Sequence, residues 1–178
     1  REIAILRQEL EAPLTVNALL QLLLGWALDS TGAEAGAISL VDRDRGELVL
    51  QVHEGYPFGG VTTYGEPRRR VSWEHGVAGK AARSGRSILI RDINREPDQQ
   101  AGAPHIRAEL AIPIRADGGA LAVLVLGSPR SAAFGESETA FAQAICDLAP
   151  QPLRRALRYQ ELLETSTQLN QVVTSMPI

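Results

Sequence analysis

The central apolar run of the chain lies at residues 120–126, where every residue is Ala, Leu or Val. Strict alternation of apolar and polar residues is absent there, so both faces of an extended segment should be covered. A second apolar run at residues 111–114 precedes it, and Asp117-Gly118-Gly119 joins the two with residues that take positive φ at little cost. The pattern predicts an antiparallel hairpin on which the other elements pack.

Two further strands are predicted at residues 37–41 and 47–53, because a polar connection ending in Gly46 joins them. The second strand should have one apolar and one mixed face, formed by Leu48, Leu50 and Val52 and by Val49, Gln51 and His53 respectively. The pattern of residues 71–92 predicts a short strand followed by a helix and another strand. Ser72 or Glu74 should cap the helix, Gly85 should end it, and the second strand should lie at residues 87–90.

Apolar residues at helical spacing predict helices at both ends of the chain. Residues 1–11 carry a narrow stripe of coiled-coil type, and Pro13 interrupts it. Thr15 is a candidate N-cap for a second helix, which should end near Gly32 and pack on the sheet.

A closing helix is predicted to begin near residue 136, and Pro150 and Pro152 are expected to kink or break it. Beyond these prolines, residues 159–176 form a second coiled-coil seam of fewer than three heptads.

Residues 55–70 and 94–105 are rich in glycine, proline and polar residues, so both segments should be irregular. Tyr56, Phe58 and Tyr64 lie in the first of them and either anchor it to the core or line a pocket.

Composition limits the classes of protein to which this chain can belong. With 178 residues and 44% hydrophobic residues, the chain can build one core with flanking helices. A net charge of −3 with scattered basic residues gives no support for binding nucleic acid or an anionic membrane. One cysteine excludes an internal disulfide and fits a reducing, cytoplasmic compartment. No apolar segment has the length of a membrane span. The chain begins with Arg1 rather than Met, so we expect it to be part of a longer protein.

Several motifs together resemble the GAF domain, a regulatory sensor module. They are GVAGKAA at residues 76–82, GRS at 85–87, IRD at 90–92, LAIPI at 110–114, LAVLVL at 121–126 and FGESE at 134–138. The resemblance implies an α+β fold with a central antiparallel sheet of about six strands. The N- and C-terminal helices would pack on one face, with short helices and loops over a ligand pocket on the other.

The resemblance also implies an organisation into three parts. We expect a linker helix at residues 1–12, a GAF domain at 13–157 and a signalling helix at 158–178 that leads to a following domain. By the habit of the family, the terminal helices would form a homodimer. The downstream effector would be the transmitter of a sensor histidine kinase.

Enzyme and metal chemistry find little support in the residues. A phosphate-binding loop would need other residues at Glu74 and Ala81, and the three histidines are too far apart for a local metal motif. Methionine sulfoxide reductases of GAF type depend on several cysteines, and bilin-binding members attach the pigment to a pocket cysteine. Here Cys146 lies on the predicted closing helix between Ile145 and Leu148, where we expect it to be a small buried residue. We expect no enzyme activity in this region, no metal and no cofactor.

A noncovalent pocket remains as the candidate site. Trp73 and His75 precede the short helix, whose N-terminal amides would favour an anion. His105 and Arg107 lie on the segment expected to cross the pocket, and the Arg107 guanidinium would suit a carboxylate. Together with Tyr56 these are the predicted ligand-binding residues. A ligand-free dimerising spacer, and a haem sensor with His105 as axial ligand, stay open as alternatives.

Overall fold

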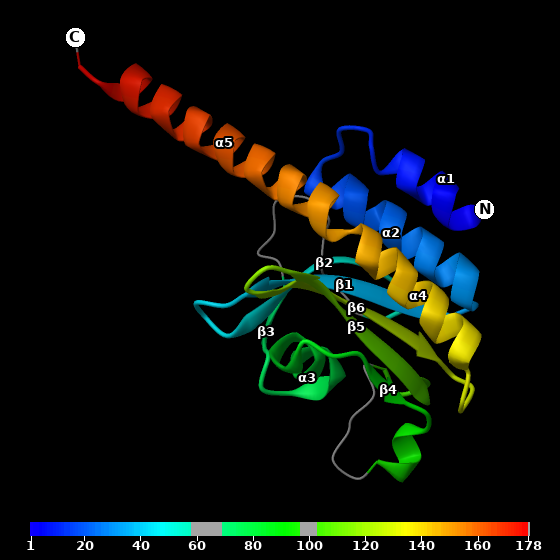
Figure 1. The fold of residues 1–178 in the computed structure, drawn as a ribbon. Helices are drawn as coiled ribbons and strands as arrows, with labels where there is room; N and C mark the ends of the chain where they lie inside the picture. Colours follow the sequence, from blue (N-terminus) through cyan, green and yellow to red (C-terminus); the bar gives the residue numbers. More distant parts are fainter. Residues whose placement is uncertain (58–68, 97–102, 178) are drawn as a thin grey trace.

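Six strands form one antiparallel sheet in the order β3-β2-β1-β6-β5-β4 (Figure 1). The computed structural model describes residues 1–57, 69–96 and 103–177. The strands are β1 (Ala35–Asp42), β2 (Glu47–Glu54), β3 (Arg70–Ser72), β4 (Ile88–Ile90), β5 (Ala108–Ala116) and β6 (Gly119–Ser128). Neighbouring strands are antiparallel throughout, and β5 and β6 form the predicted hairpin, in which Ala116 pairs with Gly119. The predicted α+β fold class is confirmed.

Helices cover both faces of the sheet, but unequally (Figure 1). One face carries α1 (Glu2–Glu9), α2 (Val16–Thr31), α4 (Glu136–Leu148) and the first part of α5 (Pro150–Ser175). The other carries α3 (Gly76–Ser84) and the 3-10 helix η1 (Ile93–Arg95).

The ends of α2 follow the predicted signals. The Thr15 hydroxyl oxygen accepts a hydrogen bond from the Ala18 N–H at 3.1 Å, and Gly32 ends the helix with a φ of 66°.

Side chains of β6 alternate between the two faces of the sheet. Ala122, Leu124 and Leu126 pack against the helices in the larger core, whereas Val123 and Val125 face the α3 side. This two-residue period is the one expected of a strand that is covered on both faces.

The prediction of a single apolar face for β2 is wrong. The β1–β2 register shifts between Ile38 and Ser39, and Gln51 is the extra residue of a bulge. Leu48 and Leu50 therefore pack on the α3 side, whereas Val52 joins the core under the helices. A bulge reverses the direction of every following side chain, which simple alternation cannot reveal.

Helix α1 folds back onto its own chain after the break at Pro13. Leu6 of α1 and Leu10 just after it are buried in the core under the helices. The Trp26 Nε1–H donates to the Glu9 carboxylate at 2.9 Å, and the Arg155 Nη2 donates to the Leu10 carbonyl at 2.9 Å. The apolar stripe predicted as a coiled-coil seam at this end is thus covered within the same chain.

The prolines after α4 produce only a short break. Ala149 separates α4 from α5 and keeps right-handed helical geometry, with φ −78° and ψ −31°. Pro150 then occupies the first turn of α5, where a missing N–H costs nothing. Helix α5 continues roughly in the direction of α4 and leaves the body of the domain (Figure 1). Among the described residues, no helix has both the length and the apolar character to cross a membrane.

Candidate ligand pocket

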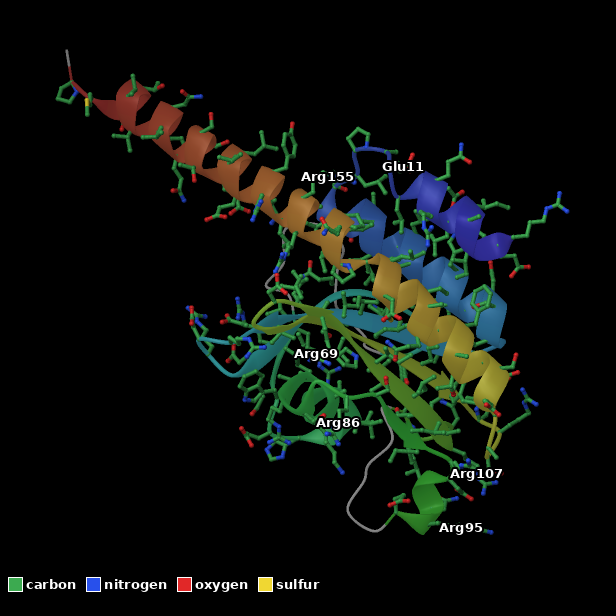
Figure 2. The ribbon with its side chains drawn as sticks, in the orientation of Figure 1. Glu11, Arg69, Arg86, Arg95, Arg107 and Arg155 are labelled. Atoms are coloured by element: carbon green, nitrogen blue, oxygen red, sulfur yellow. The ribbon has the colours of Figure 1, made fainter. Side chains whose placement is uncertain are left out.

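A cavity of about 180 Å³ lies on the side of the sheet opposite the four long helices, under the first turn of α3. Figure 2 shows Arg69 on this side of the sheet, near α3. The described lining residues come from five strands, the adjoining segments and α3: Ala37, Ser39, Leu48, Leu50, Tyr56, Arg69, Val71, Gly76, Val77, Ala78, Glu109 and Val125.

Most of the wall is aliphatic, because alternate residues of the central strands face this side. Ala37 comes from β1, Leu48 and Leu50 from β2, and Val125 from β6. The bulge at Gln51 matters here, since both leucines lie before it and so face the cavity. An apolar wall with few polar groups is typical of a small-molecule site.

One end of the cavity carries a buried polar pair. The Tyr56 hydroxyl donates to the Glu109 Oε1 at 3.2 Å, and the two residues are only 5% and 3% exposed. Burial, and then the negative charge of Glu109, raises the pKa of Tyr56 far above its ordinary value, so the hydroxyl keeps its proton and donates.

Gly127 makes room for this pair. It lies opposite Glu109 in the β5–β6 register, and a Cβ at this position would lie 2.5 Å from the Tyr56 hydroxyl oxygen. The absence of a side chain on β6 therefore lets the phenol reach the carboxylate.

Arg69, just before β3, also lines the cavity and is exposed. Its carbonyl accepts from the Leu50 N–H at 2.9 Å. Leu50 pairs with Ser39 of β1, Ser39 pairs with Val123 of β6, and Val123 pairs with Pro113 of β5. Pro113 lies four residues after Glu109 on the same strand. The backbone of Arg69 thus lies at the β3 edge of the sheet, several strands away from the backbone of Glu109 on β5.

Two glycines shape the start of α3 and its contact with the segment that follows β3. Gly76 has a φ of 75°, and a Cβ on Gly79 would clash with the Trp73 carbonyl oxygen. The prediction that Ser72 or Glu74 caps this helix is wrong. His75 is the N-cap without a side-chain hydrogen bond, and the Ser72 hydroxyl instead accepts from the Glu74 N–H at 3.2 Å.

Of the five predicted site residues, only Tyr56 is among the described residues that line the cavity. Trp73 packs in the apolar cluster under α3, whereas His75 and His105 are exposed. The Arg107 Nη2 donates to the Asp92 Oδ2 at 2.7 Å, next to Arg95 of η1 (Figure 2). The other two aromatic residues singled out in the sequence, Phe58 and Tyr64, lie outside the described residues.

Sequence reasoning missed Glu109 and Arg69. A signal for Glu109 was available, since it is the one charged residue between Ala108 and Ile114 in an otherwise apolar strand. Charged residues are almost never fully buried unless they are paired, so a charge in such a run points to a local polar partner.

Cys146 lies on the other side of the sheet from the cavity. It is 2% exposed in the core under the helices, and burial, together with the charge of Asp147, raises the pKa of its thiol. Within residues 1–57, 69–96 and 103–177, no three His, Cys, Asp or Glu side chains are grouped so that they could hold a metal ion.

Comparisons with known proteins find solved structures with a similar fold. The GAF domain of a phosphoenolpyruvate-protein phosphotransferase from Coxiella burnetii is 21% identical, with a TM-score of 0.74 over 89% of this chain and 94% of that chain. The corresponding Acinetobacter domain is 14% identical, with a TM-score of 0.73 over 88% of this chain and 92% of that chain. The free methionine-R-sulfoxide reductase from Neisseria meningitidis, solved with its substrate, is 21% identical, with a TM-score of 0.70 over 88% of this chain and 89% of that chain.

No curated protein matches the chain. The family model of the GAF domain, in contrast, matches residues 13–151, which make up most of this chain. The six-stranded antiparallel sheet with its helices is an α+β fold that matches these GAF-domain neighbours. The chain therefore belongs to the GAF domain family.

Proposed function

We propose that this GAF domain is a sensor that binds a small molecule noncovalently in the cavity and signals through α5 to a following effector domain. GAF domains are generally regulatory. The observation that carries the proposal is the cavity with its buried Tyr56–Glu109 pair, on the face opposite the helix that leaves the domain. The effector in this proposal is the transmitter of a sensor histidine kinase, and the compartment is the cytoplasm.

An enzyme is the second candidate, because solved neighbours from Neisseria meningitidis and Thermoplasma acidophilum are free methionine-R-sulfoxide reductases. The GAF resemblance implies that such enzymes depend on several cysteines. This chain has one, Cys146, which is buried away from the cavity with a raised thiol pKa. A raised pKa keeps a thiol protonated and weakly nucleophilic. These facts support the sensor over the reductase.

Exposed apolar residues on α5 support a homodimer. The seam consists of Tyr159, Leu162, Leu169, Val173 and Met176, each at least 60% exposed. Gln160 and Glu164 face the β1–β2 hairpin, with which they line a groove, so the seam lies on the opposite side of the helix. Helices in proteins gain most of their stability from packing of an apolar face, so a partner helix would stabilise the exposed part of α5. Because the stripe of α1 is covered within the chain, we propose pairing through α5 alone.

Blocking the cavity tests the sensor. Ala37 is 7% exposed and lines the cavity, so Ala37→Leu should fill part of it. Ala4→Leu makes the same change at an exposed position of α1 and serves as the control. Native mass spectrometry and thermal shifts against a metabolite panel should find a ligand for the wild type and the control but not for Ala37→Leu. If no compound binds any of the three proteins, the ligand-free spacer is the better account.

Light scattering after size exclusion tests the dimer. Leu169→Glu places a charge in the α5 seam and should give a monomer. Gln168→Glu introduces the same charge beside the seam and should leave the dimer intact. A monomeric wild type at every concentration would contradict the proposal.

A further inference from the structure

Strand β3 has one face toward the cavity and the other toward α5. Val71 lines the cavity, whereas Arg70 lines a groove between the β1–β2 hairpin and α5. The register agrees with this arrangement, because alternate residues of a strand face opposite sides of a sheet. Val71 pairs with Leu48, another residue of the cavity, and Arg70 pairs with Val49, another residue of the groove. The two faces of β3 therefore border the cavity and the groove.

Of the six strands described, β3 is the least buried. It is an edge strand of three residues that pairs with β2, and all three residues are exposed. Val71 itself is 42% exposed although it lines the cavity. A segment with few buried apolar contacts opens at a low cost in free energy. A molecule in the cavity that packs on Val71 would bury part of this surface and hold β3 in place.

Arg70 connects β3 to the hairpin on the groove side. Its Nη1 lies 3.0 Å from the Asp42 Oδ2 and 3.0 Å from the Glu47 Oε2. Both ion pairs use Nη1, so the other N–H groups of the guanidinium have no partner within the part of the chain that the structure describes. Arg70 can therefore keep its hold on the hairpin and still donate to a further carboxylate in the groove.

Glu164 is the carboxylate on the α5 side of this groove. It lines the groove with Gln160, whose Nε2 donates to the Glu164 Oε1 at 3.1 Å. This face of α5 is opposite the seam, so pairing of two copies does not cover it. Opposite charges that line one groove attract each other, and the attraction grows as their separation falls. Fixing Arg70 in the groove therefore favours a position of α5 beside the hairpin.

We propose, resting on the ligand-sensing function above, that β3 couples the cavity to α5 through Arg70. A molecule that packs on Val71 holds β3 on β2. Arg70 is then fixed in the groove, where its guanidinium attracts the Glu164 carboxylate and holds the first exposed turns of α5 beside the hairpin. In this mechanism Val71 contacts the ligand, and Arg70 is a positioning residue for the helix that leaves the domain.

Benzene is a suitable probe of this coupling. It binds in apolar cavities of about 150 Å³, and the cavity here has a volume of about 180 Å³ and mostly aliphatic walls. Hydrogen exchange followed by mass spectrometry reports how often the backbone of each segment opens. In the wild type, benzene should slow exchange at β3 and, by about two- to fivefold, at residues 160–166 of α5, which is the range that one exposed ion pair gives. All samples are compared at one protein concentration, because pairing through the α5 seam would also slow exchange.

Variants of the groove connect the effect to Arg70. Arg70→Gln and Glu164→Gln each remove one charge of the proposed pair, so benzene should still slow exchange at β3 but no longer at residues 160–166. Arg43→Gln is the matched control on the hairpin, since Arg43 lines the same groove but does not belong to β3. Glu161→Gln is the control on α5, at an exposed position that is not among the described residues of the groove. Both controls should respond to benzene as the wild type does.

The outcomes separate this coupling from the sensor function itself. If benzene slows exchange at β3 but not at residues 160–166 of the wild type, or if the slowing of α5 persists in Arg70→Gln or in Glu164→Gln, the coupling is wrong. If benzene slows neither segment, Val71 does not hold β3 through a molecule in the cavity, and the proposal also falls. In each case the sensor stands when a compound of the metabolite panel binds the wild type but not Ala37→Leu. The two charge variants test the pair from opposite sides, so one of them decides the matter even when the other does not fold.

Discussion

A methyl group on β6 should displace the buried tyrosine of the cavity. In Gly127→Ala the new Cβ would lie 2.5 Å from the Tyr56 hydroxyl oxygen and 3.2 Å from Ile106 Cδ1. Carbon and oxygen atoms that are not bonded do not approach to 2.5 Å, so the phenol ring must move away from β6. That movement lengthens the hydrogen bond from Tyr56 to Glu109, which is already 3.2 Å.

The magnitude follows from two opposing terms. A hydrogen bond to a charged group contributes about 1.5–3 kcal/mol, and both partners here are almost fully buried. Alanine in place of glycine inside a strand recovers about 0.5–1 kcal/mol of backbone entropy. The net loss of unfolding free energy should be about 1–2 kcal/mol. For a chain of this size that corresponds to a fall in melting temperature of about 2–8 °C.

Two measurements check the result. Calorimetry or circular dichroism gives the melting temperature, with Gly25→Ala as a matched control on α2. A Cβ at Gly25 meets nothing within 4 Å, so this second substitution should raise stability by about 0.5–1 kcal/mol. Ultraviolet titration reports the tyrosine itself. Because burial and then Glu109 raise the pKa of Tyr56, a displaced phenol should ionise at lower pH in Gly127→Ala than in the wild type.

The two substitutions should shift stability in opposite directions, although the chemical change is the same. If Gly127→Ala melts at or above the wild-type temperature and the tyrosine titration is unchanged, the phenol has not been displaced. In that case Tyr56 does not depend on the space that Gly127 leaves, and the account of the polar end of the cavity is wrong.

Three further changes test other parts of the fold. Thr15→Ala removes the N-cap of α2 and should cost about 1 kcal/mol in urea unfolding. Desolvation raises the pKa of Asp92, but the hydrogen bonds from Arg107 and the Asn94 N–H, together with the charges of Arg107 and Arg95, lower it overall. These interactions therefore stabilise the fold above the unfolded pKa of about 3.9, and the effect is lost as pH falls through the folded pKa. Arg107→Leu should accordingly lower the urea midpoint at pH 7, and the difference should vanish in acid. Cys146, which is 2% exposed, should react with a thiol reagent only as fast as the protein unfolds.

Much of the fold could be predicted because its signals are local. The sequence Asp117-Gly118-Gly119 permits the tight turn between β5 and β6, and the two flanking apolar runs pair across it. Thr15 and Gly32 mark the ends of α2 through hydrogen bonds and dihedral angles that involve only neighbouring residues. Such features need no knowledge of the rest of the chain.

The site could not be predicted in the same way, because it depends on contacts between distant residues. Tyr56 and Glu109 are 53 positions apart, and they meet only because Gly127 of a third segment leaves space. The bulge at Gln51 is set by the pairing of β2 with β1, and it separates Leu48 and Leu50, which face the cavity, from Val52, which faces the helices. Glycine, proline and alternation signals carry no information about which strand will become the neighbour.

A short route connects the cavity to the helix that leaves the domain. Val125 of β6 lines the cavity, and its neighbours Leu124 and Leu126 on the same strand pack in the core under the helices. That core also contains Leu153 and Ala156 of α5. Protein interiors are packed as densely as organic crystals, so a displacement of a central strand moves the side chains on its other face rather than being absorbed. Under the proposed sensor function, a ligand that presses on Val125 therefore acts on the root of α5 through a single strand.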